Sequence, residues 1–262
     1  MPANYAHYRF GAAMMDKMPG DIRRTVKRYR RLYDVGLHGP DIFYYFAPGV
    51  STKVGKLGDK FHEQTGREFF ARVCRGLRLK PSEAGFSYLY GVLSHYCLDS
   101  ICHKWVQEKE EEENIPHLVM EGEFDRYLLE LDGKTPAYCQ DLSPHIRLIA
   151  QEHAVVASFY PGADEKRTAF AVKNMARLTK LVATPEGLRR TAMKKTVSTV
   201  AQSYLNIFIP EQPVPGCDKI NVELMEKYRQ ALELAPELLE QIGAHLTYNA
   251  PLGEAFSATF NG

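Results

Sequence analysis

Hydrophobic side chains recur every three or four positions along most of the chain, which is the spacing of one face of an α-helix. The pattern predicts about nine helices, over residues 4–17, 21–33, 59–79, 82–107, 116–131, 144–159, 165–183, 186–208 and 221–242. No stretch shows the sustained two-residue alternation of a β-strand. We therefore expect an all-α protein, a multi-helix bundle.

Two stretches interrupt the helical pattern. Residues 34–58 are rich in glycine and proline around the aromatic segment 42–46, and they predict a long loop. A loop of this length in a compact domain is often functional. Residues 243–262 combine turn-forming residues with spaced hydrophobic ones and predict an irregular strap over the bundle. No low-complexity linker or internal repeat divides the chain, so we expect a single domain over residues 1–262.

The composition excludes several classes of protein. With 45% hydrophobic residues and a formal net charge of +1, the chain is that of an ordinary globular protein, and no stable nucleic-acid partner is expected. Five cysteines without a regular pairing pattern favour a reducing compartment. The first residues lack the pattern of a secretory signal, and no stretch approaches the about 20 apolar residues that span a bilayer. We expect a cytoplasmic protein without a transmembrane segment, of unknown oligomeric state.

The segment GVLSHYCLDSICHKWV, residues 91–106, carries the most informative chemistry. His95, Asp99 and His103 are spaced four apart, so they share one stripe of the predicted helix 82–107. Gly91 extends the same stripe backward, and its missing side chain leaves room for a neighbouring helix to approach with ligands of its own. Imidazole and carboxylate at this spacing are what one helix needs to supply several ligands to metal ions.

Further candidate ligands lie on both sides of this stripe. His117 and Glu121 repeat the four-residue spacing on the next predicted helix, and His7, Asp41 and His62 lie upstream. Asp41 taken alone is as typical of a turn or cap as of a ligand. Neutral histidine and ionised carboxylate buried together in a bundle are costly unless a cation pairs with them. We therefore predict a cluster of zinc ions, while manganese or iron would accept similar ligands.

The chain has other histidines for which a simpler interpretation holds. His145 and His153 stand apart from carboxylates at helical spacing. A lone histidine of this kind is more often a hydrogen-bonded structural residue than a ligand, and we interpret both in that way.

In this order, the candidate ligands resemble the zinc-dependent bacterial phospholipase C family, whose all-helical fold is shared with zinc-dependent single-strand nucleases. The residues that carry the resemblance are His7, Asp41, His62, His95-x-x-x-Asp99, His103 and His117-x-x-x-Glu121. They cover the first half of the chain, and the second half is compatible as helices.

The resemblance implies three zinc sites. Asp41, His62, His95 and Asp99 would surround one ion, and His103, His117 and Glu121 would hold a second. His7 would hold the third with a bridging Asp99 and the amino terminus, at Met1 or at Pro2 after removal of Met1. The chain lacks the amino-terminal Trp with which secreted members bind zinc, and its Asp99–His103 spacing is shorter than theirs, which indicates an unbroken helix.

The implied chemistry is hydrolysis of a phosphate ester. Zinc would activate a water for attack on phosphorus, and Asp41 is the candidate catalytic residue that orients or deprotonates this water. The family suggests phospholipid as substrate. Two alternatives stay open: a hydrolase of soluble phosphate esters or nucleotides with the same metal cluster, and a non-enzymatic helical interaction protein with structural metal.

Overall fold

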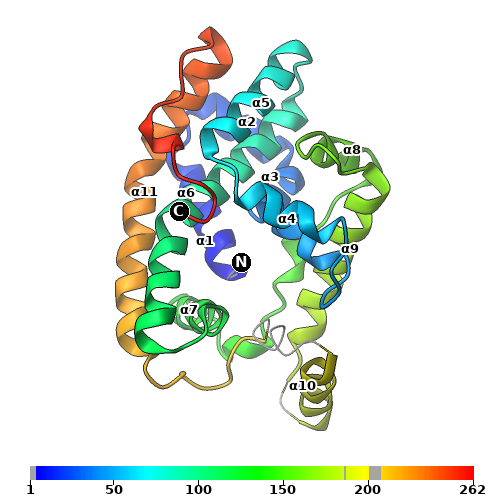
Figure 1. Cartoon of the computed structure of the whole chain (residues 1–262), viewed down its shortest axis with the longest axis vertical. Helices are drawn as coiled ribbons and strands as arrows, with labels where there is room; N and C mark the ends of the chain where they lie inside the picture. The colour runs from blue at the N-terminus through cyan, green and yellow to red at the C-terminus, as the bar shows by residue number, and fades with distance from the viewer. Residues whose placement is uncertain (1–3, 186, 201–207) are drawn as a thin grey trace.

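The computed structural model describes residues 4–185, 187–200 and 208–262, and this part of the chain is all-α, as predicted (Figure 1). Its α-helices are α1 Asn4–Lys17, α2 Gly20–Arg28, α3 Arg30–Gly36, α4 Gly55–His62, α5 Gly66–Leu79, α6 Glu83–Glu113, α7 His117–Leu131, α8 Ala150–Ser158, α9 Glu165–Val182, α10 Leu188–Val200 and α11 Cys217–Tyr248. Short 3-10 helices lie at η1 Gly39–Tyr45, η2 Ala137–Cys139, η3 Ser143–His145 and η5 Glu254–Phe256. The expected number of about nine helices is therefore too low.

Two of the predicted helices are each divided in two. The segment 21–33 breaks at Tyr29, whose φ of −113° and ψ of 42° leave the helical region between α2 and α3. The segment 59–79 breaks before Thr65, which begins α5 with a capping box that it shares with Glu68. Asp59, where the predicted helix starts, lies inside α4, which begins at Gly55. Hydrophobic spacing continues across both breaks, so the pattern alone does not reveal them.

The other differences lie at the ends of helices and in the loop. The predicted helix 144–159 begins only at Ala150, after η3. The predicted loop 34–58 holds the end of α3, η1 and the start of α4. The predicted helix 186–208 includes residues 186 and 201–207, which lie outside the described part of the chain.

Helix α6 is the central element of the bundle (Figure 1). It packs against α1, α2, α3, α5, α7, α8 and α11. Its closest neighbour is α3, because Gly36 faces Gly91 and a Cβ added at Gly91 would lie 2.3 Å from the carbonyl oxygen of Tyr33. The expectation that Gly91 makes room for a neighbouring helix is confirmed. Because of this contact, the segment that follows α3, with η1, lies beside the stripe of α6 that contains His95.

The carboxyl-terminal residues form the expected strap, although the chain stays helical until Tyr248, with Asn249 in the left-handed region at φ 54°. Phe256 and Phe260 are fully buried against Tyr96 and Phe70. An isolated bridge joins Thr65 to Thr259. The strap is thus fixed along α5 and α6, beside the candidate ligands.

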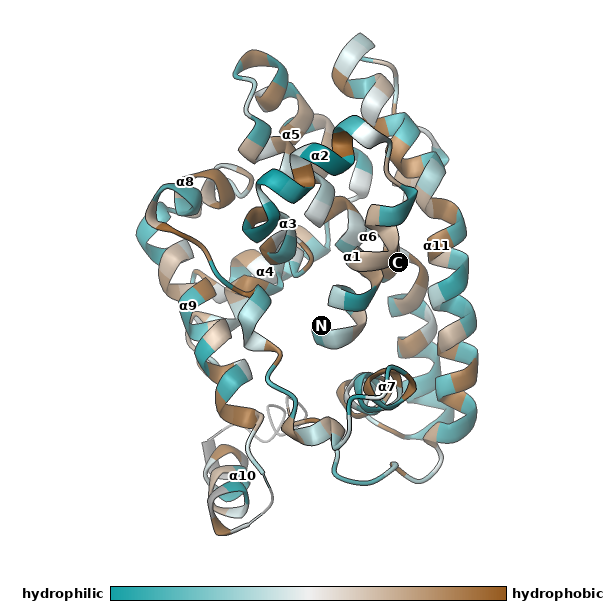
Figure 2. Ribbon diagram, turned by 180° about the vertical axis from the view of Figure 1, so that it is seen from behind, coloured by the Kyte–Doolittle hydropathy of each residue, from teal (hydrophilic) through white to brown (hydrophobic). Residues whose placement is uncertain are grey.

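Hydrophilic residues interrupt the hydrophobic ones along the helices (Figure 2). Within residues 4–185, 187–200 and 208–262, no helix combines the length and the hydrophobicity needed to cross a bilayer.

Candidate metal centre

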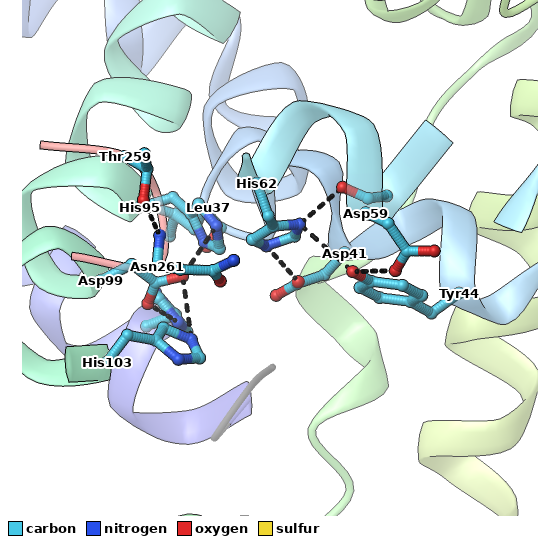
Figure 3. Close-up of polar contacts among 12 residues, drawn as sticks. Leu37, Asp41, Tyr44, Asp59, His62, His95, Asp99, His103, Thr259 and Asn261 are labelled. Carbon is cyan, nitrogen blue, oxygen red and sulfur yellow. Dashed lines mark hydrogen bonds and ion pairs between the residues drawn. The ribbon is translucent and has the colours of Figure 1, made fainter. Parts of the chain in front are cut away.

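Asp99 lies at the centre of a group of buried imidazoles (Figure 3). Its Oδ2 atom is 3.1 Å from Nε2 of His95, one turn earlier on α6, and 3.5 Å from Nε2 of His103, one turn later. Its Oδ1 atom is 3.1 Å from Nε2 of His7, on α1. The predicted stripe therefore does place three side chains together, and the two oxygens of Asp99 face different imidazoles.

A second group shares His95. Asp41 comes from η1 and His62 from the last residue of α4, and Oδ1 of Asp41 is 3.1 Å from Nε2 of His62. In each of the groups His7–His95–Asp99 and Asp41–His62–His95, the candidate ligand atoms lie within 4.8 Å of one another. Gly39 permits this convergence, because a Cβ there would lie 2.4 Å from the ring of His95. Side chains from four separate segments thus meet at one place.

Backbone carbonyls fix two of these rings. The Nδ1–H of His62 donates to the Gly58 carbonyl at 2.8 Å, and that of His95 donates to the Leu37 carbonyl at 3.2 Å. A neutral ring that carries its proton on Nδ1 presents a lone pair at Nε2. In both residues, this lone pair faces a carboxylate.

The carboxylate oxygens and imidazole nitrogens that face each other therefore need a cation between them. In the described part of the chain, the buried atoms without a hydrogen-bond partner include Oδ1 and Oδ2 of Asp41, Oδ2 of Asp99, and Nε2 of His62 and His95. Buried polar atoms are rarely left in this state. A metal cation would accept electron pairs from all of them, so the residues present fit zinc.

The protonation states agree with this arrangement. Burial alone would raise the pKa of Asp99, but the neighbouring histidines hold it well below its usual range. The pKa of Asp41 is also lowered, by the positive charge of the amino terminus and then by His62 and His95. Burial lowers the pKa of His95 to about 4 and that of His103 to about 3. Burial also lowers the pKa of His7, but the charge of Asp99 outweighs it and the net shift is upward. At neutral pH, the ionised Asp99 thus meets neutral imidazoles at His95 and His103, the forms that bind metal, whereas the upward shift of the His7 pKa favours its protonated form until a cation takes the place of the proton.

A small cavity of about 30 Å³ adjoins the first group. Its lining includes His7, Asp99, His103 and Glu121 of α7. Burial raises the pKa of Glu121 to about 8. Glu121 therefore faces the same space as the candidate ligands.

His117 lies elsewhere. It is the first residue of α7, is about one-third exposed, and its Nδ1 atom is 2.8 Å from Oε2 of Glu110 at the end of α6. It belongs to neither of the two groups of candidate ligands found in the described residues. The amino terminus, proposed as a ligand through Met1 or Pro2, lies outside the described residues. Each of these assignments stays a prediction.

Some residues of the site gave no signal in the sequence. Phe260 of the strap lies with its ring centre 5.9 Å from that of His95 and 6.2 Å from that of His62. The side chain of the next residue, Asn261, reaches into the space between the two groups (Figure 3). Both residues are brought to the site by tertiary packing over a long sequence distance, which no local spacing records.

Two more histidines form a separate pair. Nε2 of buried His38 and Nε2 of His145 share a hydrogen bond of 2.9 Å, and the ring of His145 stacks on Tyr8. His145 is therefore a hydrogen-bonded structural histidine, as interpreted from the sequence.

The chain was compared with known proteins. A family model described as zinc dependent phospholipase C matches residues 6–173. This range contains every candidate ligand named above except the amino terminus. No curated protein and no solved structure matches the chain.

Proposed function

Because the chain belongs to the zinc-dependent phospholipase C family, we propose that it hydrolyses phosphate esters with two to three zinc ions bound in this cluster. The observation that carries the proposal is the meeting, at 3.1 Å, of buried carboxylate oxygens with imidazole Nε2 atoms that have no hydrogen-bond partner in the described part of the chain. Such a set costs folding free energy without a cation and becomes favourable with one.

We assign the ligands from the directions of their atoms. Nε2 of His95 serves one ion, since Nδ1 of the same ring donates to the Leu37 carbonyl. The two oxygens of Asp99 face His7 and His95 respectively, so Asp99 would bridge two ions. One set would then be Asp41, His62, His95 and Asp99 Oδ2, and a second would be His7 with Asp99 Oδ1. His103 and Glu121 line the same small cavity as His7 and would complete the second set or hold a third ion. His117 and the amino terminus are proposed as further ligands.

When bound, zinc would act as a Lewis acid, which lowers the pKa of a water molecule and neutralises negative charge on a phosphate ester. The chain supplies the other functions. Asp41, held ionised beside His62, accepts the proton of the attacking water on a carboxylate oxygen. The amide of Asn261 donates a hydrogen bond to a phosphate oxygen of the substrate from the strap side. The buried surroundings of His95 keep bulk water away and strengthen these interactions.

The proposed substrate is a phospholipid, as the family description suggests. The test is hydrolysis of bis(4-nitrophenyl) phosphate and of phosphatidylcholine in mixed micelles, before chelation, after chelation and after zinc is returned. We expect both activities to disappear with the metal and to return with zinc. Hydrolysis of the soluble ester alone would exclude the lipid, and bound zinc without either activity would favour a structural metal.

A pair of matched variants makes this test specific. Asp41→Asn removes a candidate ligand and base, while Asp59→Asn removes an exposed carboxylate nearby that accepts a hydrogen bond from Tyr44. We expect Asp41→Asn to lower kcat at least 100-fold, since one base contributes about 10²–10⁴-fold. Asp59→Asn is expected to retain metal and activity. Equal activity in the two variants would refute the role of Asp41.

A further inference from the structure

Helix α1 carries His7 to the metal centre, and its first turn lies against α7. The ring of His7 stacks on that of His95 with centroids 4.6 Å apart. Unlike His62 and His95, His7 has no carbonyl that orients its ring, because its Nδ1 atom is buried without a hydrogen-bond partner in the described part of the chain. The position of this ring therefore depends on where the backbone of α1 is held.

A single carboxylate holds that backbone. Asp125 of α7 accepts hydrogen bonds from the backbone N–H of Tyr5 at 2.9 Å and of Ala6 at 2.8 Å. The first N–H groups of a helix have no hydrogen-bond partner within the helix, and the positive end of the helix dipole at this terminus favours a negative charge nearby. Asp125 supplies both the hydrogen-bond acceptors and the negative charge, although it lies more than 100 residues away in the sequence and is only 3% exposed. It is a helix cap provided by another helix.

The same face of α7 also reaches the cluster. Glu121 lies four residues before Asp125, one turn away on the same side of the helix. Glu121 lines the small cavity with His7 and Asp99, while Asp125 binds the residues that immediately precede His7. Helix α7 thus determines the position of Glu121 directly and that of His7 through the cap on α1.

We propose that Asp125 is a positioning residue of the metal centre, which holds the first turn of α1 so that His7 faces Asp99 and the small cavity that Glu121 also lines. This inference rests on the proposed function, since it requires that His7 binds metal. The remainder of α1 has its own anchors: Phe10 and Met14 are fully buried, and Tyr33 donates a hydrogen bond to the Gly11 carbonyl at 2.8 Å. Loss of the cap therefore loosens the turn beside His7 and leaves the helix in place.

The experiment measures zinc binding by competition with a chromophoric chelator for four proteins: wild type, Asp125→Ala, His7→Ala and the double variant. Measurements are made at pH 8, above the pKa of about 7 to which burial raises Asp125. The matched control is Asp132→Asn. Asp132 also joins α7 to α1, but through the side chains of Tyr5 and Arg9, at 2.7 Å and 2.8 Å.

We expect Asp125→Ala to weaken one equivalent of zinc about 10- to 100-fold, the usual effect of losing a group that orients a ligand. His7→Ala should weaken the same equivalent, the double variant should be no weaker than His7→Ala, and Asp132→Asn should bind as wild type. Full zinc binding by Asp125→Ala, equal weakening of every equivalent, or additive effects in the double variant would overturn the inference. A wild-type protein that binds no zinc would instead overturn the proposed function, and this inference with it.

A second variant covers the case in which Asp125→Ala does not fold. Asp125→Asn keeps one carbonyl oxygen and can accept one of the two N–H donors. It should show faster hydrogen exchange at the amides of Tyr5 and Ala6 and intermediate zinc affinity. Unchanged exchange and affinity in this variant would also overturn the inference.

Discussion

The contact between Gly36 and Gly91 brings the residues that follow α3 to the candidate metal centre, and Gly91→Ala tests this contact. A Cβ at Gly91 would lie 2.3 Å from the Tyr33 carbonyl oxygen and 2.8 Å from the Cα of Gly36, whereas ordinary contacts are 3.4–4 Å. Both obstacles are backbone, so α3 and α6 must separate by about 1 Å. Overpacking of this kind costs about 1–3 kcal/mol, and we expect the upper end because neither neighbour can rotate away.

Helix propensity acts in the opposite direction. Alanine in a helix interior is favoured over glycine by about 1 kcal/mol. The net loss in free energy of unfolding is therefore about 2 kcal/mol, which for a chain of this size lowers Tm by about 4–8 °C. The same separation lengthens the hydrogen bond of 3.2 Å from His95 to the Leu37 carbonyl. Zinc affinity should fall as well, by about tenfold or more.

Gly76→Ala is the matched control. Gly76 is an exposed glycine inside α5, and nothing lies within 4 Å of an added Cβ. Here the propensity gain acts alone, so Tm should rise by about 2–4 °C. Both variants are followed by thermal unfolding in one buffer with saturating zinc. A Gly91→Ala protein as stable as wild type, or one that shifts in the same direction as Gly76→Ala, would refute the close packing of α3 on α6.

Three further predictions concern single side chains. Asp99→Asn should lower bound zinc, measured by elemental analysis, by more than one equivalent, because a bridging ligand serves two ions; a loss of one equivalent or less excludes bridging. Burial raises the pKa of Asp34 in the folded state from 3.8 to about 6, so the folded state holds this proton more tightly than the unfolded state. As the pH rises from about 4 to 6, the wild type should therefore lose stability relative to Asp34→Asn, by about 3 kcal/mol at most in urea unfolding. A stability difference that does not change with pH contradicts this. Thr65→Ala should lower the free energy of unfolding by about 1 kcal/mol through loss of the cap on α5, and an unchanged midpoint in urea would show that the cap contributes little.

The helices that the sequence predicted best are those with their own start and stop signals. Helix α9 begins after Asp164, whose side chain accepts from the Arg167 N–H, and it was predicted to within one residue of its end. Helix α6 begins at Glu83 after its N-cap Ser82, one residue after the predicted start, and runs on to Glu113, beyond the predicted end at residue 107. The break at Tyr29 was missed because a single residue outside the helical region leaves the hydrophobic spacing almost unchanged.

The candidate site shows a similar division. Spacing along one helix was enough to place His95, Asp99 and His103 on one stripe, since helix geometry is local. Spacing could not determine the orientation of His117, which depends on the partner Glu110 at the end of another helix. It also could not reveal Asp125 or Asn261, because their roles depend on which segments meet in the folded chain.

The central claim is that zinc ions lie between these carboxylates and imidazoles. The most direct measurement is an anomalous difference map from crystals of the zinc-loaded protein, recorded above and below the zinc absorption edge. We predict peaks beside both oxygens of Asp99, one within bonding distance of His7 and one within bonding distance of His95 and His62. A map without peaks at these residues would contradict the account.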